Sequence, residues 1–337
     1  MSPGPHLLYE RLGAESTVEW ASGLSGRSLR FLLVAPGALR VAVLGPGGVG
    51  GLLAALLTRA GSSVVVLAGD STSHAISERG LRVESRLFGN FEVNVETATR
   101  LQSEVDVCLI TVKATQLERA LERVPEDVAG QALVIPFLNG IDHVDLLRTR
   151  FRTNVVPATI RVEVARVGPG LIRQTSPFAS VEIATSDVVR ERIEPLAAQL
   201  RTTGLAVTLR EDEVAMLWDK LALLGPLALL TTHQRGNVGV VRTIRRDDAI
   251  ALIREVAAVA RAEGASADPE AALRLLDLAP ETMESSMQRD QAAGQPLELD
   301  AIGGAVLRHA AAQGVPVPVT TRLVDELQAR ERARTER

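Results

Sequence analysis

A short stretch that changes abruptly from apolar residues to glycine constrains the fold of this chain most strongly. Residues 40–50 read Arg-Val-Ala-Val-Leu-Gly-Pro-Gly-Gly-Val-Gly, and Gly45, Gly47 and Gly50 follow G-x-G-x-x-G spacing. The leucines that follow recur with the spacing of one helix face, at positions 52, 53, 56 and 57. We therefore expect a buried strand, a tight turn and a helix, in that order.

The glycines of this pattern have distinct physical roles in dinucleotide binding. Gly45 permits the turn, Gly47 lets the backbone approach a pyrophosphate, and Gly50 lets the helix pack closely on the strand. The first amides of the helix favour an anion at the same place. The alternative is a glycine-rich turn that binds no ligand. The order of strand, turn and helix favours a cofactor loop formed by Gly45, Pro46, Gly47, Gly48, Val49 and Gly50.

Composition narrows the class of protein. The 337 residues are 46% hydrophobic and 23% charged, which fits a globular chain long enough for two domains. The net charge of -4, without a basic block, argues against nucleic acid as a partner. The single cysteine, Cys108, lies in an apolar run and excludes both an intrachain disulfide and a Cys-rich zinc site, as in a reducing cytoplasm. The apolar stretch at 221–230 is too short to span a membrane.

The order of predicted elements indicates an α/β domain followed by a helical domain. Strands alternate with helices up to residue 151, as in a Rossmann-type doubly wound parallel sheet, and residues 155–184 are expected to add an antiparallel extension. Strand patterns vanish after about residue 210, where helical patterns take over. We expect a poorly ordered extension over 1–39, an NAD(P)-binding Rossmann domain over 40–209 and an all-α substrate domain over 210–332, with the site in the cleft between the domains.

Three polar residues stand out against this background. Lys220 interrupts an apolar helical pattern, Glu298 begins a later predicted helix, and Asn139 follows a predicted strand at 132–138. Each has a structural alternative: a lysine stem that covers apolar surface, a carboxylate that favours a helix dipole, and an Asn-Gly turn. Ligands of doubly wound sheets lie beyond the carboxyl ends of the strands, which favours a functional role for Asn139.

Taken together, five motifs resemble the ketopantoate reductase (2-dehydropantoate 2-reductase) family over residues 40–330. They are the glycine turn, Val112-Lys113-Ala114-Thr115-Gln116, Leu138-Asn139-Gly140, Trp218-x-Lys220-Leu221, and Ser285-Ser286-Met287-x-x-Asp290 followed by Glu298-x-Asp300. The resemblance implies that Lys113 and Gln116 lie beside the cofactor. It implies that Asn139 lies at both the nicotinamide and the substrate.

The resemblance also implies an activity, the NADPH-dependent reduction of 2-dehydropantoate to pantoate in pantothenate and coenzyme A biosynthesis. Lys220 would act as the general acid, and Glu298 would keep it protonated and bind a substrate hydroxyl. Ser286 would hold the carboxylate of the small 2-oxo acid substrate, and no metal is required. A cytoplasmic enzyme is implied, and apolar helices of the second domain are compatible with a homodimer.

Two departures from the family pattern leave alternatives open. Leu224 and Ala228 stand where the family usually has asparagines, which admits another branched 2-oxo acid as substrate, or a cofactor-binding relative that has lost turnover. Asp70 lies 20 residues beyond Gly50, where a carboxylate favours the ribose hydroxyl of NAD, although it is also compatible with a helix N-cap. Arg79 is a candidate for the phosphate of NADP. We expect NADP, with NAD as the alternative.

Overall fold

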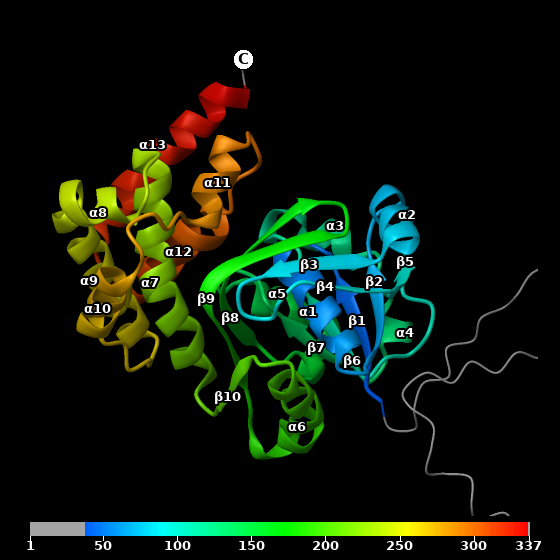
Figure 1. Ribbon diagram of the computed structural model, residues 1–337. Coiled ribbons are helices and arrows are strands. Elements are labelled where there is room, and N and C mark those ends of the chain that lie inside the picture. The colour runs from blue at the N-terminus through cyan, green and yellow to red at the C-terminus, as the bar shows by residue number, and fades with distance from the viewer. Residues whose placement is uncertain (1–37, 336–337) are drawn as a thin grey trace, which may run out of the picture. The chain divides into compact units, whose positions relative to one another are not determined.

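The computed structural model describes residues 38–335, and the chain from Leu39 onward forms one compact unit. The extension expected over 1–39 lies almost entirely outside the described residues. All strands of the described chain precede residue 211, and a series of helices follows (Figure 1). The domain boundary expected at residue 210 coincides with this change of secondary structure, and the division into two domains stays a prediction.

The first sheet is entirely parallel, as expected for the N-terminal part. Its order is β5-β2-β1-β6-β7, so β1 lies in the middle and its carboxyl end meets the glycine turn. The central strands are continuous apolar runs because helices cover both faces of such a sheet and bury the apolar side chains of these strands. The strands are β1 (Arg40–Leu44), β2 (Ser63–Leu67), β5 (Glu96–Ala98), β6 (Val107–Ile110) and β7 (Leu133–Pro136).

A second, mixed sheet replaces the expected extension of the first. Its order is β10-β9-β3-β4, with β8 antiparallel to β9, while β9 runs parallel to both β3 and β10. The prediction of an antiparallel pair over 155–184 is confirmed, but the prediction that it extends the first sheet is wrong. The strands are β3 (Leu81–Ser85), β4 (Phe91–Val93), β8 (Ala158–Gly168), β9 (Leu171–Ala184) and β10 (Ala206–Arg210).

Helix α1 (Gly48–Arg59) packs against strands of both sheets, and its residues from Gly50 to Leu57 are buried. A side chain at Gly51 would overlap Ile172 of β9, so the helix approaches that strand closely. The remaining helices of this half are short connections or surface covers. They are α2 (Asp70–Arg79), η1 (Ala114–Gln116), α3 (Leu117–Leu121), α4 (Glu126–Ala129), α5 (His143–Phe151), η2 (Arg152–Asn154) and α6 (Asp187–Thr202).

The rest of the described chain is helical and has its own apolar core around α7 and α9. Helix α7 is long and apolar enough to cross a membrane, but 72% of its apolar window is buried inside the protein, as in a core helix. The helix expected to begin at Glu298 starts with a π-helical segment. The elements are α7 (Glu213–Gln234), α8 (Val238–Ile244), α9 (Arg246–Ala262), α10 (Pro269–Leu278), α11 (Ser286–Ala292), η3 (Asp300–Gly304), α12 (Ala305–Gln313) and α13 (Pro318–Thr335).

Candidate active site

The glycine turn has the geometry that its spacing predicts. Gly45 has a φ of 92°, and a side chain there would overlap Val112 at the end of the β6 segment. A side chain at Gly50 would overlap Thr111 and the carbonyl oxygen of Gly45. The Thr111 hydroxyl donates to the carbonyl oxygens of Leu44 (2.9 Å) and Gly45 (2.8 Å) and so fixes the turn, a role that sequence reasoning missed.

The start of α1 fits a pyrophosphate. Gly47 is the N-cap residue and has no side chain to satisfy the first helix amides, and the space around its missing side chain is open to 4 Å. Unsatisfied amides at a helix N-terminus attract anions. Pro46 is buried in the turn, Gly48 packs beneath the Val164 carbonyl of β8, and Val49 continues the first turn. These residues form an anion cradle that a larger side chain at Gly47 would fill.

Lys113 links the end of β6 to the helical half. Its Nζ atom lies 2.6 Å from Oδ1 of Asp290 on α11, so this ammonium crosses from one half to the other. Gln116 lies at the end of η1 and is exposed. Lys113 and Lys220 are the only lysines in the sequence, and all other basic side chains apart from histidine are arginine.

Asn139 and Glu298 meet across the two halves. Nδ2 of Asn139 donates to Oε2 of Glu298 at 3.0 Å, and the backbone amide of Ala114 donates to Oε1 at 3.0 Å. Glu298 is only 4% exposed, so both bonds compensate the loss of water at its carboxylate. The motifs at the ends of β6 and β7 therefore converge on one buried acid from the helical half.

Lys220 lies on α7, half-buried, and its Nζ atom donates to the carbonyl oxygen of Leu138 at 3.3 Å. This contact places the ammonium at Leu138, the residue that directly precedes Asn139. The pKa of Lys220 is lowered from 10.5 to about 8, mainly by burial and additionally by the charge of Arg161, while the charge of Glu298 opposes the shift. Glu298 thus acts on Lys220 through space.

Arg161 belongs to a charged network that sequence reasoning missed. Its guanidinium pairs with Glu182, which also accepts from Arg210 at 2.7 Å, and Arg210 reaches Asp219 at 3.1 Å. Burial opposes ionisation of Glu182, but the hydrogen bonds from the two arginines outweigh it and hold its pKa below the usual value. The signal that the sequence offered was an arginine, Arg161, within a predicted strand. The network ties β8, β9 and β10 to the helix that carries Lys220.

Besides Asn139, the positions expected around the substrate lie on α7 and α11. Ser286 is the first residue of α11 and is half-buried, while its neighbour Ser285 caps that helix and accepts a 2.7 Å hydrogen bond from Thr231 of α7. Leu224 is half-buried and Ala228 is buried on α7. The positions where the family pattern has asparagines therefore carry apolar side chains here.

Asp70 is exposed in the first turn of α2, beyond the end of β2. The N-cap of α2 is Gly69, so the interpretation of Asp70 as an N-cap is wrong. Arg79 is the last residue of the same helix, about 14 Å from Asp70 at 1.5 Å per residue. Arg79 therefore lies far from Asp70, where we expect the ribose of a dinucleotide.

A different arginine lies at that place. Arg123 donates through Nη1 to the carbonyl oxygens of Ala68 (3.0 Å) and Thr99 (2.6 Å). Its Nη2 lies 3.8 Å from the position that a Cβ atom on Gly69 would occupy. A cation is thus held beside the N-terminus of α2, next to Asp70. Sequence reasoning missed it because Arg123 follows α3, far along the chain.

A cavity of about 350 Å³ opens beside Asn139, between η1, the start of α5 and η3. His143 lines it, is 7% exposed, and has no hydrogen-bond partner among the described residues at either ring nitrogen. Burial and the charge of Lys220 lower the pKa of His143 to about 4, against an opposing effect of Asp142, so this ring is neutral at physiological pH.

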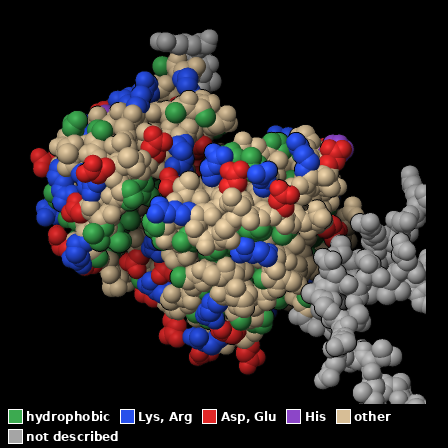
Figure 2. Space-filling view, in the orientation of Figure 1, with side chains coloured by type: hydrophobic (Ala, Val, Ile, Leu, Met, Phe, Trp, Pro, Cys, Tyr) green, Lys and Arg blue, Asp and Glu red, His purple; other side chains and the backbone are tan. Residues whose placement is uncertain are grey.

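Charges on the molecular surface are mixed. On the face drawn in Figure 2, the basic and acidic side chains of the described residues are interspersed, without an extended basic patch. No cluster of three or more potential metal ligands occurs among the described residues.

A parallel sheet with a glycine turn at its central strand, faced by a half-buried lysine and a buried acid from a helical half, defines a Rossmann-type oxidoreductase. Sequence models of the family described as "Ketopantoate reductase PanE/ApbA" match residues 41–187, and those of its C-terminal region match residues 213–331. The chain therefore belongs to the ketopantoate reductase family, and the prediction from its motifs is confirmed.

Curated relatives agree with this assignment. The chain is 32% identical over 298 residues to 2-dehydropantoate 2-reductase of Mycobacterium tuberculosis, covering 86% of this chain and 97% of the relative. It is 28% identical over 308 residues to the enzyme of that name from Caulobacter vibrioides, covering 86% and 98%. The protein is an oxidoreductase of the 2-dehydropantoate 2-reductase type.

Solved structures share the fold. A PanE/ApbA family ketopantoate reductase from Ralstonia eutropha superposes with a TM-score of 0.79 at 28% identity, covering 88% of this chain and 100% of that one. A D-mandelate dehydrogenase, solved with NADH and anilino(oxo)acetate, gives a TM-score of 0.81 at 22% identity, covering 88% and 99%. At that identity the second comparison concerns the fold alone. The predicted architecture, a Rossmann-type sheet followed by helices, is confirmed.

Proposed function

We propose that this protein reduces 2-dehydropantoate to pantoate with NADPH, in pantothenate and coenzyme A biosynthesis in the cytoplasm. The observation that carries the proposal is the convergence of Lys220, Asn139 and Glu298 at the carboxyl ends of β6 and β7, on the side where the glycine turn receives a dinucleotide. Family membership supports the reaction class.

Different residues would bind the cofactor and the substrate. The loop from Gly45 to Gly50 would hold the pyrophosphate, and Lys113, Gln116 and Asn139 would flank the rest of the nicotinamide cofactor. When bound, the reduced cofactor supplies a hydride to the C2 carbonyl of the 2-oxo acid. Ser286 would hold the substrate carboxylate from the first turn of α11.

Lys220 would act on the carbonyl oxygen. An ammonium with a pKa of about 8 is roughly nine-tenths protonated at pH 7, and it is a stronger acid than an ordinary lysine. It would donate a hydrogen bond and then a proton as negative charge develops on that oxygen. Glu298 favours the protonated amine and orients Asn139 through their 3.0 Å hydrogen bond.

The preference for NADPH rests on Arg123. Its guanidinium is held beside Gly69 by two carbonyl oxygens, so it presents a positive charge to a ribose 2′-phosphate at little cost in side-chain entropy. Asp70 in the first turn of α2 favours NADH instead, because a carboxylate accepts from a 2′-hydroxyl and repels a phosphate. NADH is therefore the second candidate.

The two cofactors are distinguished by initial rates with NADPH and NADH at matched concentrations. We expect a higher kcat/KM with NADPH, and Arg123→Gln should lower that value about tenfold while changing the value for NADH less than about twofold. Asp70→Asn should improve NADPH use. A wild-type preference for NADH that Asp70→Asn removes would contradict the NADPH proposal.

The substrate is tested by following the absorbance of NADPH with 2-dehydropantoate and identifying pantoate as the product. Lys220→Met should abolish turnover and retain NADPH binding by calorimetry, whereas Arg274→Met, which removes an exposed cation from α10, should leave both turnover and binding unchanged. Because Leu224 and Ala228 are apolar, other branched 2-oxo acids belong in the same assay. Faster turnover of one of them would replace 2-dehydropantoate, and cofactor binding without any turnover would indicate a relative that has lost catalysis.

We also propose that the protein forms a homodimer through exposed apolar side chains of α8 and α10. Ile244, at the end of α8, and Leu275 and Leu278 on α10 expose 70%, 50% and 81% of their surface, and hydrogen bonding between Arg242 and the Asp277 carbonyl holds these helices together. Sedimentation of the full chain would measure the assembly, and a monomer at all concentrations would contradict it.

A further inference from the structure

The turn between β7 and α5 carries an aspartate that is used in an unusual way. Asp142 occupies the N-cap position of α5, where an aspartate side chain ordinarily accepts from a helix amide. Here Asp142 has a helical φ of -63° and makes no side-chain cap hydrogen bond. Asp142 lies three residues after Asn139, and its carboxylate instead reaches the helical half of the protein.

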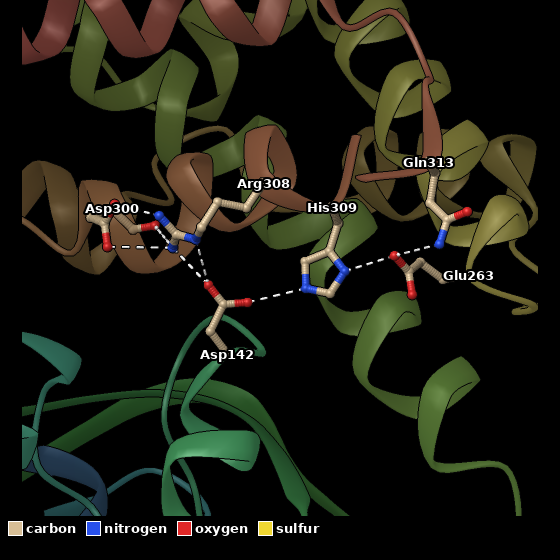
Figure 3. Close-up of polar contacts among 6 residues, drawn as sticks. All are labelled: Asp142, Glu263, Asp300, Arg308, His309 and Gln313. Atoms are coloured by element: carbon tan, nitrogen blue, oxygen red, sulfur yellow. Dashed lines mark hydrogen bonds and ion pairs between the residues drawn. The ribbon is translucent and has the colours of Figure 1, made fainter. Parts of the chain in front are cut away.

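Two consecutive residues of α12 bind this carboxylate. Oδ2 of Asp142 accepts from Nε of Arg308 at 2.8 Å and lies 2.6 Å from Nη2, and Oδ1 lies 3.1 Å from Nε2 of His309 (Figure 3). Nδ1 of His309 lies 2.8 Å from Oε1 of Glu263 at the end of α9. Asp142 is thus held between two side chains whose own positions are fixed by further contacts.

Arg308 also binds the segment that carries Glu298. Its Nη1 donates to Oδ1 of Asp300 at 2.7 Å, and its Nη2 donates to the Asp300 carbonyl oxygen at 3.1 Å. Figure 3 shows this guanidinium between the two aspartates. Asp300 lies two residues after Glu298, so one arginine joins the turn of Asn139 to the segment of its hydrogen-bond partner.

The backbones meet in the same region. Gly140 has a φ of 81°, and a side chain there would overlap the carbonyl group of Ala301, so the turn and η3 are in direct contact. His309 packs edge-on against Trp218, with ring centroids 5.4 Å apart at 87°. Trp218 lies on α7, two residues before Lys220. The contacts of Asp142 therefore connect with all three segments that carry the candidate catalytic side chains.

We propose that Asp142 is a positioning residue, which holds the turn of Asn139 against Glu298 and α7 through Arg308 and His309. The proposal rests on the proposed function only for its effect on turnover. A side chain that is misplaced by about 1 Å lowers catalysis by up to about 100-fold. Loss of the carboxylate should therefore lower kcat while the glycine turn and Arg123, which lie elsewhere, continue to bind the cofactor.

The experiment compares Asp142→Ala with Asp277→Asn, which removes a carboxylate paired with Arg246 on the surface of the helical half. We expect Asp142→Ala to lower kcat roughly 10- to 100-fold with the KM for NADPH changed less than about threefold. Asp142→Glu should recover part of the loss. In an Asn139→Ala background the further effect of Asp142→Ala should be small, because contacts that act through one another are not additive.

A second measurement does not depend on the reaction. The amide of Ala114 is protected by its hydrogen bond to Glu298, so its hydrogen exchange, measured on the full chain by mass spectrometry, should accelerate in Asp142→Ala and stay unchanged in Asp277→Asn. Equal kcat and equal Ala114 exchange in a folded Asp142→Ala protein would overturn the inference. Loss of thermal stability with unchanged kcat would also overturn it. If the wild-type protein turns over no 2-oxo acid, the exchange result alone decides.

Discussion

The acidity of Lys220 is the property of the site that can be tested most directly. A pKa of about 8 means that the amine is half protonated at pH 8 and about one-tenth protonated at pH 9. If the protonated amine donates to the carbonyl oxygen, kcat/KM for reduction of the 2-oxo acid should fall as the pH rises through about 8. An unperturbed lysine would keep kcat/KM level until about pH 10.

Two substitutions should move this pKa in opposite directions. Arg161→Gln removes a positive charge that disfavours the ammonium, so the pKa of Lys220 should rise. Glu298→Gln removes a negative charge that favours it, so the pKa should fall. Glu298→Gln keeps the size and shape of the side chain, which limits repacking at that position.

The pKa of Lys220 can be measured directly because the sequence contains only two lysines. Lysine labelled with carbon-13 at the ε position gives two side-chain signals, one for Lys113 and one for Lys220, and a Lys113→Arg variant assigns them. The chemical shift of each signal then follows its own protonation across the pH range, with or without turnover. A midpoint for Lys220 near 10.5, or shifts of the same sign in Arg161→Gln and Glu298→Gln, would refute the reasoning.

Three further expectations concern stability and reactivity. The pKa of Lys220 is lower in the folded protein than in the unfolded chain, so stability rises with pH between about 8 and 10.5. Below pH 8 the full cost of burying the ammonium lowers the unfolding free energy. Lys220→Met should therefore raise the unfolding free energy at pH 7 by about 1–3 kcal/mol in urea titrations. The pKa of His143, about 4 against 6.5 when unfolded, makes stability fall as the pH drops from about 6.5 to 4. His143→Leu should flatten this part of the Tm profile, and an equally steep profile would contradict the assignment. Cys108 is fully buried with its pKa raised to about 12, so a thiol reagent should react with it only after unfolding; rapid labelling of the native protein would show that the strand opens.

Local sequence patterns predicted the parts of the fold that depend on neighbouring residues. The apolar run that begins at residue 40 forms β1, and the glycine spacing predicted the φ of Gly45 and the close approach at Gly50. The pairing of β8 with β9 was also accessible, because only two residues separate these strands. The parallel pairing of β3 with β9 joins residues about 90 positions apart, and no local alternation specifies it.

The candidate site divides in the same way. Lys220, Glu298 and Asn139 stand in short motifs, and the structure brings them together, so a family resemblance was enough to select them. Arg123 and Asp142 act through partners that are distant in sequence, and each resembles an ordinary surface residue when its neighbours in the chain are considered alone. The π-helical segment η3, which precedes α12, was missed because a five-residue hydrogen-bond step hardly changes the apolar pattern.

The confinement of both lysines to the site has a practical consequence. Reagents that couple dyes, biotin or solid supports to amines ordinarily modify the outside of a protein at many points. In this chain, apart from the amino terminus, they have targets only at Lys113 and Lys220. Immobilisation through the lysine amines would thus modify two residues of the candidate site, whereas guanidine-directed chemistry would find an arginine-rich exterior.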